Sequence, residues 1–191
     1  MSRTGEFAFH YGAVSPSGRI SGRIQGREMK EIIDVNTGEV RAGGKGLILR
    51  STAIGSCIVI AAYETSSRTG ALSHIMLPGS APSRERQKTK YAGNAITEMI
   101  KKLVKAGAKK ERIEACLVGA GNVLREKDDT ICRDNIESVT KQLGKRRIAI
   151  RASAVGGTSR RSVSLDIEIG RVSYTEGDGE EKLLWRFKSK D

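Results

Sequence analysis

The chain has 191 residues, enough for one domain with a sizeable core, and its 34 Lys and Arg against 22 Asp and Glu give a net charge of +12. This charge favours acidic partners, but an aromatic content of 4% is too low for a single-strand stacking platform, so nucleic acid is disfavoured. Three cysteines without a C-x-x-C pair and only two histidines argue against a disulfide framework and a zinc site, so we expect no metal and no cofactor.

The N-terminal region and the apolar runs indicate where the protein works. Residues 1–29 carry scattered Gly and Arg with few apolar residues, which predicts a mobile basic extension. The longest apolar runs fall far short of the roughly 20 residues that cross a bilayer, and the N-terminus lacks the apolar core of a signal peptide. We therefore expect a soluble cytoplasmic protein without membrane insertion.

Regular structure is predicted from residue 32 onward. Residues 32–35 have the pattern of a short strand, 36–38 of a turn, and 46–50 of a strand that leads toward Cys57. An apolar strand over residues 58–63 begins directly after this cysteine.

A thiol and an imidazole are predicted to meet on one hairpin. His74 follows Cys57 by seventeen positions, and the segment 64–70 between them is rich in turn-forming residues. A hairpin centred on this segment would pair Cys57 directly with His74, with Cβ atoms roughly 5 Å apart. An imidazolium beside a thiol lowers the thiol pKa from about 8.5 to roughly 3.5–7.5, which would activate a cysteine nucleophile. On these residues alone a small core residue is the commoner role for a cysteine such as Cys57, since free cysteine is among the most often buried residue types.

Two helices and a strand follow. Apolar residues at intervals of three and four predict an amphipathic helix over 91–106, and residues 113–118 predict a strand. The spacing Asp134-x-x-Glu137 is that of a capping box and predicts the start of a second helix, which Gly144 ends.

Alternating strands close the chain, over residues 147–152, 162–169 and 171–174. Together the elements predict an α+β fold: a single domain of stacked or mixed sheets with flanking helices. We expect this domain to span residues 30–175, followed by a polar segment, 176–191, with room for one added strand.

Over roughly residues 30–174 the chain resembles the chemoreceptor glutamine deamidases, the CheD family of bacterial and archaeal chemotaxis. The motifs that carry the resemblance, in chain order, are Gly55-Ser56-Cys57, Ser73-His74-Ile75-Met76-Leu77-Pro78, Lys90-Tyr91-Ala92, Val118-Gly119-Ala120-Gly121, Asn135-Ile136 and Gly156-Gly157-Thr158-Ser159-Arg160-Arg161-Ser162-Val163. The Gly-Ser-Cys and His-x-Met-Leu-Pro pair at this spacing is the most specific of them.

The resemblance implies an enzyme and names its catalytic residues. It implies a protein-glutamine glutaminase that converts glutamines of methyl-accepting chemotaxis receptors to glutamate through a thioester. The family cysteine and histidine correspond to Cys57 and His74, and its third member, a threonine six positions before the cysteine, corresponds to Ser51. Thr52 is the alternative if the backbone slips by one residue. We expect backbone N–H groups around Ser56 and Cys57 to stabilise the oxyanion.

Two other functions remain open at this stage. The CheD family also binds CheC-type phosphatases, so the chain could be a non-catalytic chemotaxis adaptor that binds and stimulates such a phosphatase. A third hypothesis, a basic protein that binds nucleic acid, rests on the net charge alone. A paired thiol and imidazole favour the enzyme, because an adaptor needs neither.

Overall fold

The computed structural model describes residues 23–24, 27–28, 30–127 and 130–188. Most of the expected basic extension, 1–29, lies outside these residues. Within it, β1 (Arg23–Ile24) pairs with β2 (Arg27–Glu28) as a short antiparallel ladder.

Among the described residues, two five-stranded sheets and two α-helices make up the fold. The outer sheet consists, in spatial order, of β12 (Lys182–Arg186), β11 (Arg171–Glu176), β10 (Arg161–Asp166), β5 (Leu47–Ile54) and β3 (Glu31–Asp34). The middle sheet consists of β4 (Val40–Gly43), β7 (Thr69–Ile75), β6 (Ile58–Glu64), β8 (Glu114–Gly119) and β9 (Ala149–Val155). The helices are α1 (Ala92–Lys105) and α2 (Thr130–Lys145), and single 3₁₀ turns occur at Lys88–Lys90 and Lys110–Arg112.

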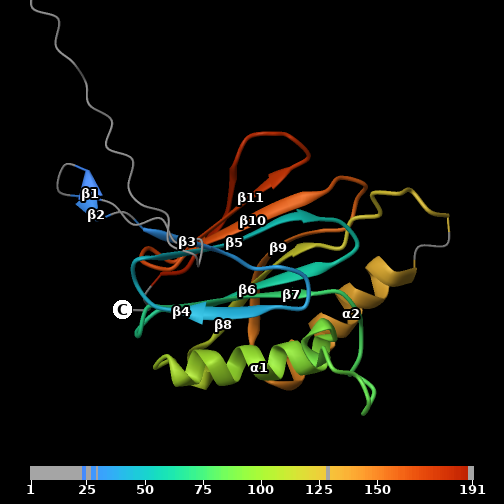
Figure 1. Ribbon diagram of the computed structural model, residues 1–191, viewed down its shortest axis with the longest axis horizontal. Coiled ribbons are helices and arrows are strands. Elements are labelled where there is room, and N and C mark those ends of the chain that lie inside the picture. The colour runs from blue at the N-terminus through green and yellow to red at the C-terminus, as the bar shows by residue number, and fades with distance from the viewer. Residues whose placement is uncertain (1–22, 25–26, 29, 128–129, 189–191) are drawn as a thin grey trace, which may run out of the picture.

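These elements stack in three layers. Figure 1 shows α1 and α2 on one side of the middle sheet, with the outer sheet on its other side. One apolar cluster lies between the middle sheet and the helices, and a second fills the space between the two sheets. The arrangement confirms the predicted α+β class, and neither helix in the described part of the chain combines the length and hydrophobicity needed to cross a bilayer.

The middle sheet is buried on both faces, which explains the unbroken apolar run of β6. Ile58 and Ile60 pack toward the helices, whereas Val59 and Ala61 face the outer sheet. His74 pairs with Val59 across the ladder and therefore shares its face. The catalytic candidates thus lie on the side of the middle sheet that faces the outer sheet.

The predicted direct pairing of Cys57 with His74 is wrong by two positions. Val59 stands opposite His74, and the last pair before the turn is Glu64 with Thr69. The turn is shorter than predicted because the Glu64 carboxylate accepts hydrogen bonds from the N–H groups of Ser66 and Ser67, which keeps Glu64 in the strand. A slip of two residues leaves every side chain on its original face, so the thiol and the imidazole still share one side of the sheet.

The second helix begins earlier than its sequence pattern indicated. α2 starts at Thr130, so Asp134 is not its N-cap and the predicted capping box is wrong. The apolar stripe extends back to Cys132, and together with Val139 and Leu143 this residue packs on the middle sheet and supports the extra turn. Strand β4 was not predicted, and β12, within the polar C-terminal segment, pairs with β11.

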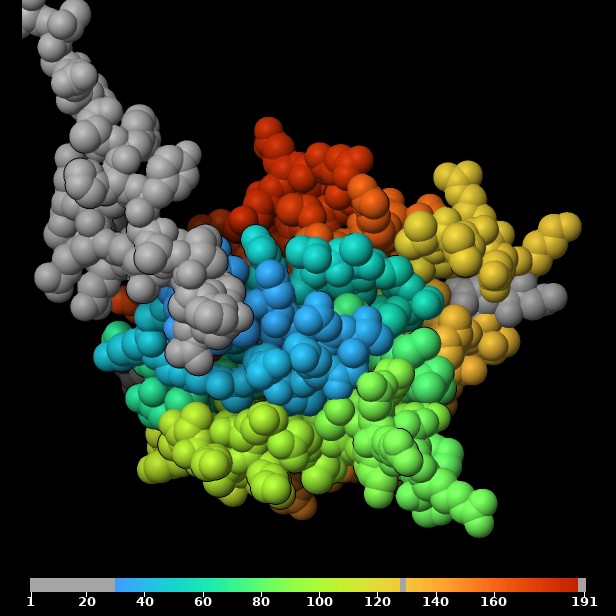
Figure 2. Space-filling view, in the orientation of Figure 1, coloured from blue at the N-terminus to red at the C-terminus, as the bar shows by residue number. Residues whose placement is uncertain are grey.

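Within the described residues the chain passes between the two five-stranded sheets four times, and two of these crossings lie beside the catalytic candidates. The turn Asn36–Glu39 connects β3 in the outer sheet to β4 in the middle sheet, and the loop 55–57 connects β5 to β6 in the same way. In Figure 2 the segment with β3, this turn and β4 (blue) lies across the molecular surface between α1 and the strands of the outer sheet. The two crossovers bring Thr37 and Cys57 to one place.

Candidate active site

Cys57 is held by the loop that follows β8. The N–H of Gly121 donates to the Gly55 carbonyl at 2.8 Å, and the N–H of Ala120 donates to the Cys57 carbonyl at 2.6 Å. Gly119 has a φ of +115°, and a Cβ placed there would lie 2.5 Å from the Cys57 carbonyl oxygen. Residue 119 can therefore approach the Cys57 carbonyl this closely only because glycine has no side chain.

Asn135 fastens the residues next to both catalytic candidates. It is fully buried in α2, and its Nδ2 donates to the carbonyls of Ser56 and Met76, each at 3.1 Å. Ser56 precedes Cys57, and Met76 follows His74 by two residues, so a single side chain ties the nucleophile loop to the end of β7. Sequence reasoning noted Asn135 only as part of a motif; the available signal was an amide on the apolar stripe of a helix.

A buried arginine supports the β8 loop from behind. Arg161 is 7% exposed, and its guanidinium donates to the Gly156 carbonyl at 2.6 Å and to a Glu176 carboxylate oxygen at 2.7 Å. The Gly156 N–H in turn donates to the Gly119 carbonyl at 3.0 Å. The Gly156-Gly157 motif is thus part of the scaffold that fixes the Cys57 backbone.

Ser51 and His74 meet between the two sheets. His74 is 4% exposed, and its Nδ1 lies 2.8 Å from the Ser51 Oγ, while the Ser51 hydroxyl donates to the Val35 carbonyl at 2.8 Å. Because the single hydroxyl proton is used on Val35, Ser51 accepts a hydrogen bond from Nδ1–H. This places the ring proton on Nδ1 and leaves Nε2 as a free base. Thr52, the alternative to Ser51, is exposed.

The turn Asn36–Glu39 covers the Nε2 side of the imidazole. The Gly38 N–H donates to the His74 carbonyl at 2.8 Å, and the His74 N–H donates to the Glu39 carbonyl at 3.0 Å. This pairing brings the Thr37 Oγ1 to 3.4 Å from Nε2, and the same hydroxyl lowers the pKa of the Cys57 thiol against the larger effect of burial. Sequence reasoning treated Thr37 only as part of a turn.

The described residues include no direct hydrogen bond between the Cys57 thiol and the His74 ring. Cys57 lies one residue before the first ladder pair, Ile58 with Ile75, and is offset by two positions from Val59, the residue opposite His74. An offset of two positions corresponds to a diagonal separation of roughly 7–8 Å, where directly opposed residues are about 5 Å apart. The Thr37 hydroxyl is the group that interacts with both. Ser56, expected to support the oxyanion, is exposed beside the thiol, and its carbonyl is already bound by Asn135.

Burial keeps both reactive groups neutral at rest. Removal from water raises the pKa of the Cys57 thiol above 9.0, although hydrogen bonds from Thr37 and from its own N–H act in the opposite direction. Burial likewise lowers the pKa of His74 below 6.5, against the effect of the Val35 carbonyl. The predicted lowering of the thiol pKa by an imidazolium is therefore wrong for the resting protein: a neutral, buried histidine supplies no positive charge.

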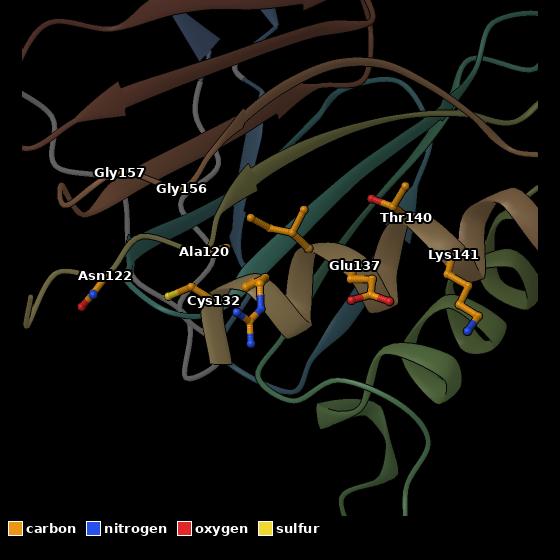
Figure 3. A pocket seen from close by; sticks show the side chains of 10 residues that line it. Ala120, Asn122, Cys132, Glu137, Thr140, Lys141, Gly156 and Gly157 are labelled. Atoms are coloured by element: carbon orange, nitrogen blue, oxygen red, sulfur yellow. The ribbon is translucent and has the colours of Figure 1, made fainter. Parts of the chain in front are cut away.

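A hollow lies behind the nucleophile loop. It has a volume of about 670 Å³ and opens between α2 and the loops after β8 and β9, as Figure 3 shows. Its lining includes Ala120, Cys132, Ile136 and Gly157. Ala120 borders both this hollow and the Cys57 carbonyl, whereas the thiol itself lies outside it.

The remaining cysteines have structural surroundings. Cys116 is fully buried between the sheets, and burial raises its pKa to about 12. Cys132 is buried on α2. Within the described part of the chain, no group of three or more His, Cys, Asp or Glu side chains is placed to hold a metal ion.

A thiol, a buried imidazole and a hydroxyl on the far ring nitrogen are the groups used by cysteine-dependent hydrolases. Comparison with known proteins agrees with this class. A sequence model described as CheD chemotactic sensory transduction matches residues 76–176. The chain is 37% identical, over 79% of its length and 76% of the relative's, to a probable chemoreceptor glutamine deamidase CheD of Chlorobium luteolum.

Two further relatives extend the match. The chain is 32% identical to the chemoreceptor glutamine deamidase CheD of Thermotoga maritima, over 81% of this chain and 97% of the relative. It is 31% identical to a probable CheD of Pyrococcus horikoshii, over 81% of this chain and 99% of the relative. The chain belongs to the CheD family.

Proposed function

We propose that this protein deamidates glutamine side chains of chemotaxis receptors, with Cys57 as the nucleophile, His74 as the base and Ser51 as the group that orients the base. The observation that carries the proposal is the Ser51–His74 hydrogen bond, because it fixes the tautomer in which Nε2, the nitrogen beside the Thr37 hydroxyl, can act as the base. Family membership supplies the reaction, the family motifs point to the three residues, and the contact between Ser51 and His74 supports that choice.

The reaction begins with removal of the thiol proton. His74 takes this proton at Nε2, and the Cys57 sulfur attacks the carboxamide carbon of the substrate glutamine. The negative charge that develops on the carboxamide oxygen is stabilised by the N–H groups of Ser56 and Cys57. Both belong to a loop whose carbonyls are already bound, so these donors are held in place before the substrate arrives.

The second half of the reaction releases ammonia and glutamate and regenerates the free Cys57 thiol. The His74 imidazolium protonates the departing nitrogen, ammonia leaves, and a thioester joins Cys57 to the substrate. His74 is then neutral again and removes a proton from water, whose oxygen attacks the thioester carbon. The C–S bond breaks to leave glutamate, and the His74 imidazolium returns the proton to the Cys57 sulfur. Each step uses groups of this chain and water alone.

The partners follow from charge and family. An acidic region of a receptor suits a chain of net charge +12, since complementary fields speed the encounter of two proteins. We place this encounter in the cytoplasm, on the cytoplasmic part of the receptor. A CheC-type phosphatase is a second partner that we propose on family grounds.

The direct test is mass spectrometry of a receptor signalling fragment from the same organism, incubated with the reduced protein, with Cys57→Ala and with Cys132→Ala. We expect glutamine-to-glutamate conversion and ammonia release with the wild type and with Cys132→Ala, and neither with Cys57→Ala. Cys132 is the control because it is also a cysteine, buried on α2, and takes no part in the proposed reaction.

The same incubation separates the enzyme from the adaptor. Absence of conversion with every variant, together with retained binding of a CheC-type phosphatase, would contradict the enzymatic proposal and favour the adaptor. Equal conversion by the wild type and Cys57→Ala would assign the activity to another residue.

A further inference from the structure

A single hydroxyl, that of Thr37, interacts with both reactive groups. The Thr37 Oγ1 lies 3.4 Å from the His74 Nε2, and the same hydroxyl acts on the Cys57 thiol by lowering its pKa against the larger effect of burial. The structure has no direct hydrogen bond between the two catalytic candidates within its described residues, so this hydroxyl is the polar connection between them. The side chain is exposed, at the tip of the turn Asn36–Glu39.

The turn that carries Thr37 is hydrogen-bonded to the backbone of His74. The Gly38 N–H and the Glu39 carbonyl pair with the carbonyl and the N–H of His74, so the turn continues the ladder on β7. Gly38 has a φ of +81°, which the turn requires, and its carbonyl accepts a hydrogen bond from the Thr89 hydroxyl at 2.6 Å. The position of Thr37 is therefore set by the His74 backbone.

The charges of the turn do not compete for this contact. The Glu39 carboxylate accepts from the Asn36 N–H and pairs with Arg41 at 3.1 Å. Desolvation and neutral hydrogen-bond partners, Thr37 and the Val35 carbonyl among them, determine how Cys57 and His74 titrate.

The donors and acceptors form one directed chain. Ser51 donates to the Val35 carbonyl and accepts from His74 Nδ1–H, which leaves Nε2 as an acceptor. The hydrogen-bond partner of Nε2 is the Thr37 hydroxyl, which must therefore donate to it. The oxygen of that hydroxyl is then free to accept from the Cys57 thiol.

We propose that Thr37 is a further catalytic residue, whose hydroxyl passes the proton of the Cys57 thiol to His74 Nε2. The S–H bond breaks as the Thr37 oxygen gains the sulfur's proton, and the original Thr37 proton moves to Nε2. The products are a thiolate and an imidazolium, and Thr37 is again a neutral hydroxyl that now donates to the thiolate. This inference rests on the proposed roles of Cys57 and His74.

The test uses Thr37→Val, which keeps the shape of the side chain without the hydroxyl, and Thr37→Ser, which keeps the hydroxyl. Thr52→Val is the matched control, because Thr52 is also an exposed threonine near the site. The rate of Cys57 alkylation by iodoacetamide is measured by peptide mass spectrometry from about pH 6 to about pH 10. Deamidation of a receptor fragment is followed with the same proteins, and circular dichroism checks their folding.

We expect Thr37→Val to shift the alkylation profile to higher pH and to lower kcat by about tenfold or more at unchanged KM, the effect of one lost hydrogen bond to a charged group. Thr37→Ser and Thr52→Val should match the wild type. An unchanged profile and kcat in Thr37→Val would overturn the proposal, as would a Thr37→Ser variant that is as slow as Thr37→Val.

The alkylation measurement needs no receptor. If the wild type fails to deamidate, the proposed function fails, while the alkylation profiles still decide whether the Thr37 hydroxyl assists removal of the thiol proton.

Discussion

Ser51 and His74 lie on different sheets, and their side chains meet across the inter-sheet core with the Ser51 Oγ 2.8 Å from the His74 Nδ1. The hydrogen bond between them is shielded from water, because Ser51 is 1% exposed and His74 4% exposed. It fixes both the orientation and the tautomer of the ring. Packing of two sheets therefore determines which ring nitrogen is the base.

Replacement of Ser51 by alanine should slow deamidation without loss of folding. The ring would lose the shorter of its two contacts at Nδ1 and keep only the Val35 carbonyl at 3.4 Å. A buried hydrogen bond of this kind contributes about 1–3 kcal/mol, so we expect kcat to fall roughly 5- to 150-fold. Ser51→Thr retains the hydroxyl and should stay active. Steady-state kinetics on a receptor fragment measures both variants, and full activity of Ser51→Ala would exclude the proposed orienting role.

Asn135→Asp should destabilise the protein at neutral pH. The aspartate has the same shape, but it replaces the donor Nδ2 with an acceptor that faces the Ser56 and Met76 carbonyls. We expect the free energy of unfolding in urea to fall by about 1–3 kcal/mol or more. Asn94→Asp is the control, because the Asn94 Oδ1 accepts from the Ala81 N–H and an aspartate can do the same. Equal stability of the two variants would contradict the role assigned to Asn135.

Two glycine-to-alanine changes should act in opposite directions. Gly119→Ala places a Cβ 2.5 Å from the Cys57 carbonyl oxygen at a φ of +115°, and we expect a loss of about 1–3 kcal/mol of stability together with loss of activity. Gly144→Ala lies inside α2 with no atom within 4 Å of the new Cβ, and should stabilise the protein by about 0.5–1 kcal/mol. Thermal and urea unfolding would measure both, and an active, stable Gly119→Ala would refute the close approach.

Activity and stability should both decline in acid because of His74. Burial lowers its pKa below the ordinary 6.5, so the unfolded chain takes up the proton first as the pH falls. The stability that comes from neutral His74 is therefore fully present above about pH 6.5 and is lost as the pH falls toward the lower pKa of the folded protein. Urea unfolding at several pH values should show this loss in the wild type and a smaller loss in His74→Gln.

The thiol should titrate in the alkaline range. Burial raises the pKa of Cys57 above 9.0, so its alkylation rate should still be increasing above pH 9. A rate that is already maximal near pH 6 would instead indicate a preformed thiolate–imidazolium pair and would contradict the neutral resting state.

Local patterns predicted the elements well and their long-range relations poorly. The helix expected over 91–106 is α1, within one residue at each end, because its apolar spacing is a local property. The register of the Cys57–His74 hairpin was missed because it depends on side-chain hydrogen bonds of Glu64 to the turn. Such capping has no periodic signature.

The site residues also fall into two groups: those that a sequence motif identifies and those whose roles depend on long-range contacts. Cys57, His74 and Ser51 were found through family motifs, and the structure brings Ser51 and His74 into contact. Thr37 and Asn135 were not assigned roles, since their contacts join residues that are 37 to 79 positions apart in the chain. A turn threonine and a helical asparagine look ordinary until the two sheets and α2 are packed.

The hydrogen bonds from Ser51 to His74 and from the turn Asn36–Glu39 to the His74 backbone exist only when both sheets are assembled. A newly synthesised or partly unfolded chain carries the same thiol but lacks an oriented base, so it cannot alter glutamines on the many proteins that it meets. Completion of the fold is in this way a safeguard against indiscriminate modification. Because burial raises the pKa of the Cys57 thiol in the folded protein, slow alkylation of Cys57 near neutral pH can distinguish correctly assembled molecules from unfolded ones in a preparation.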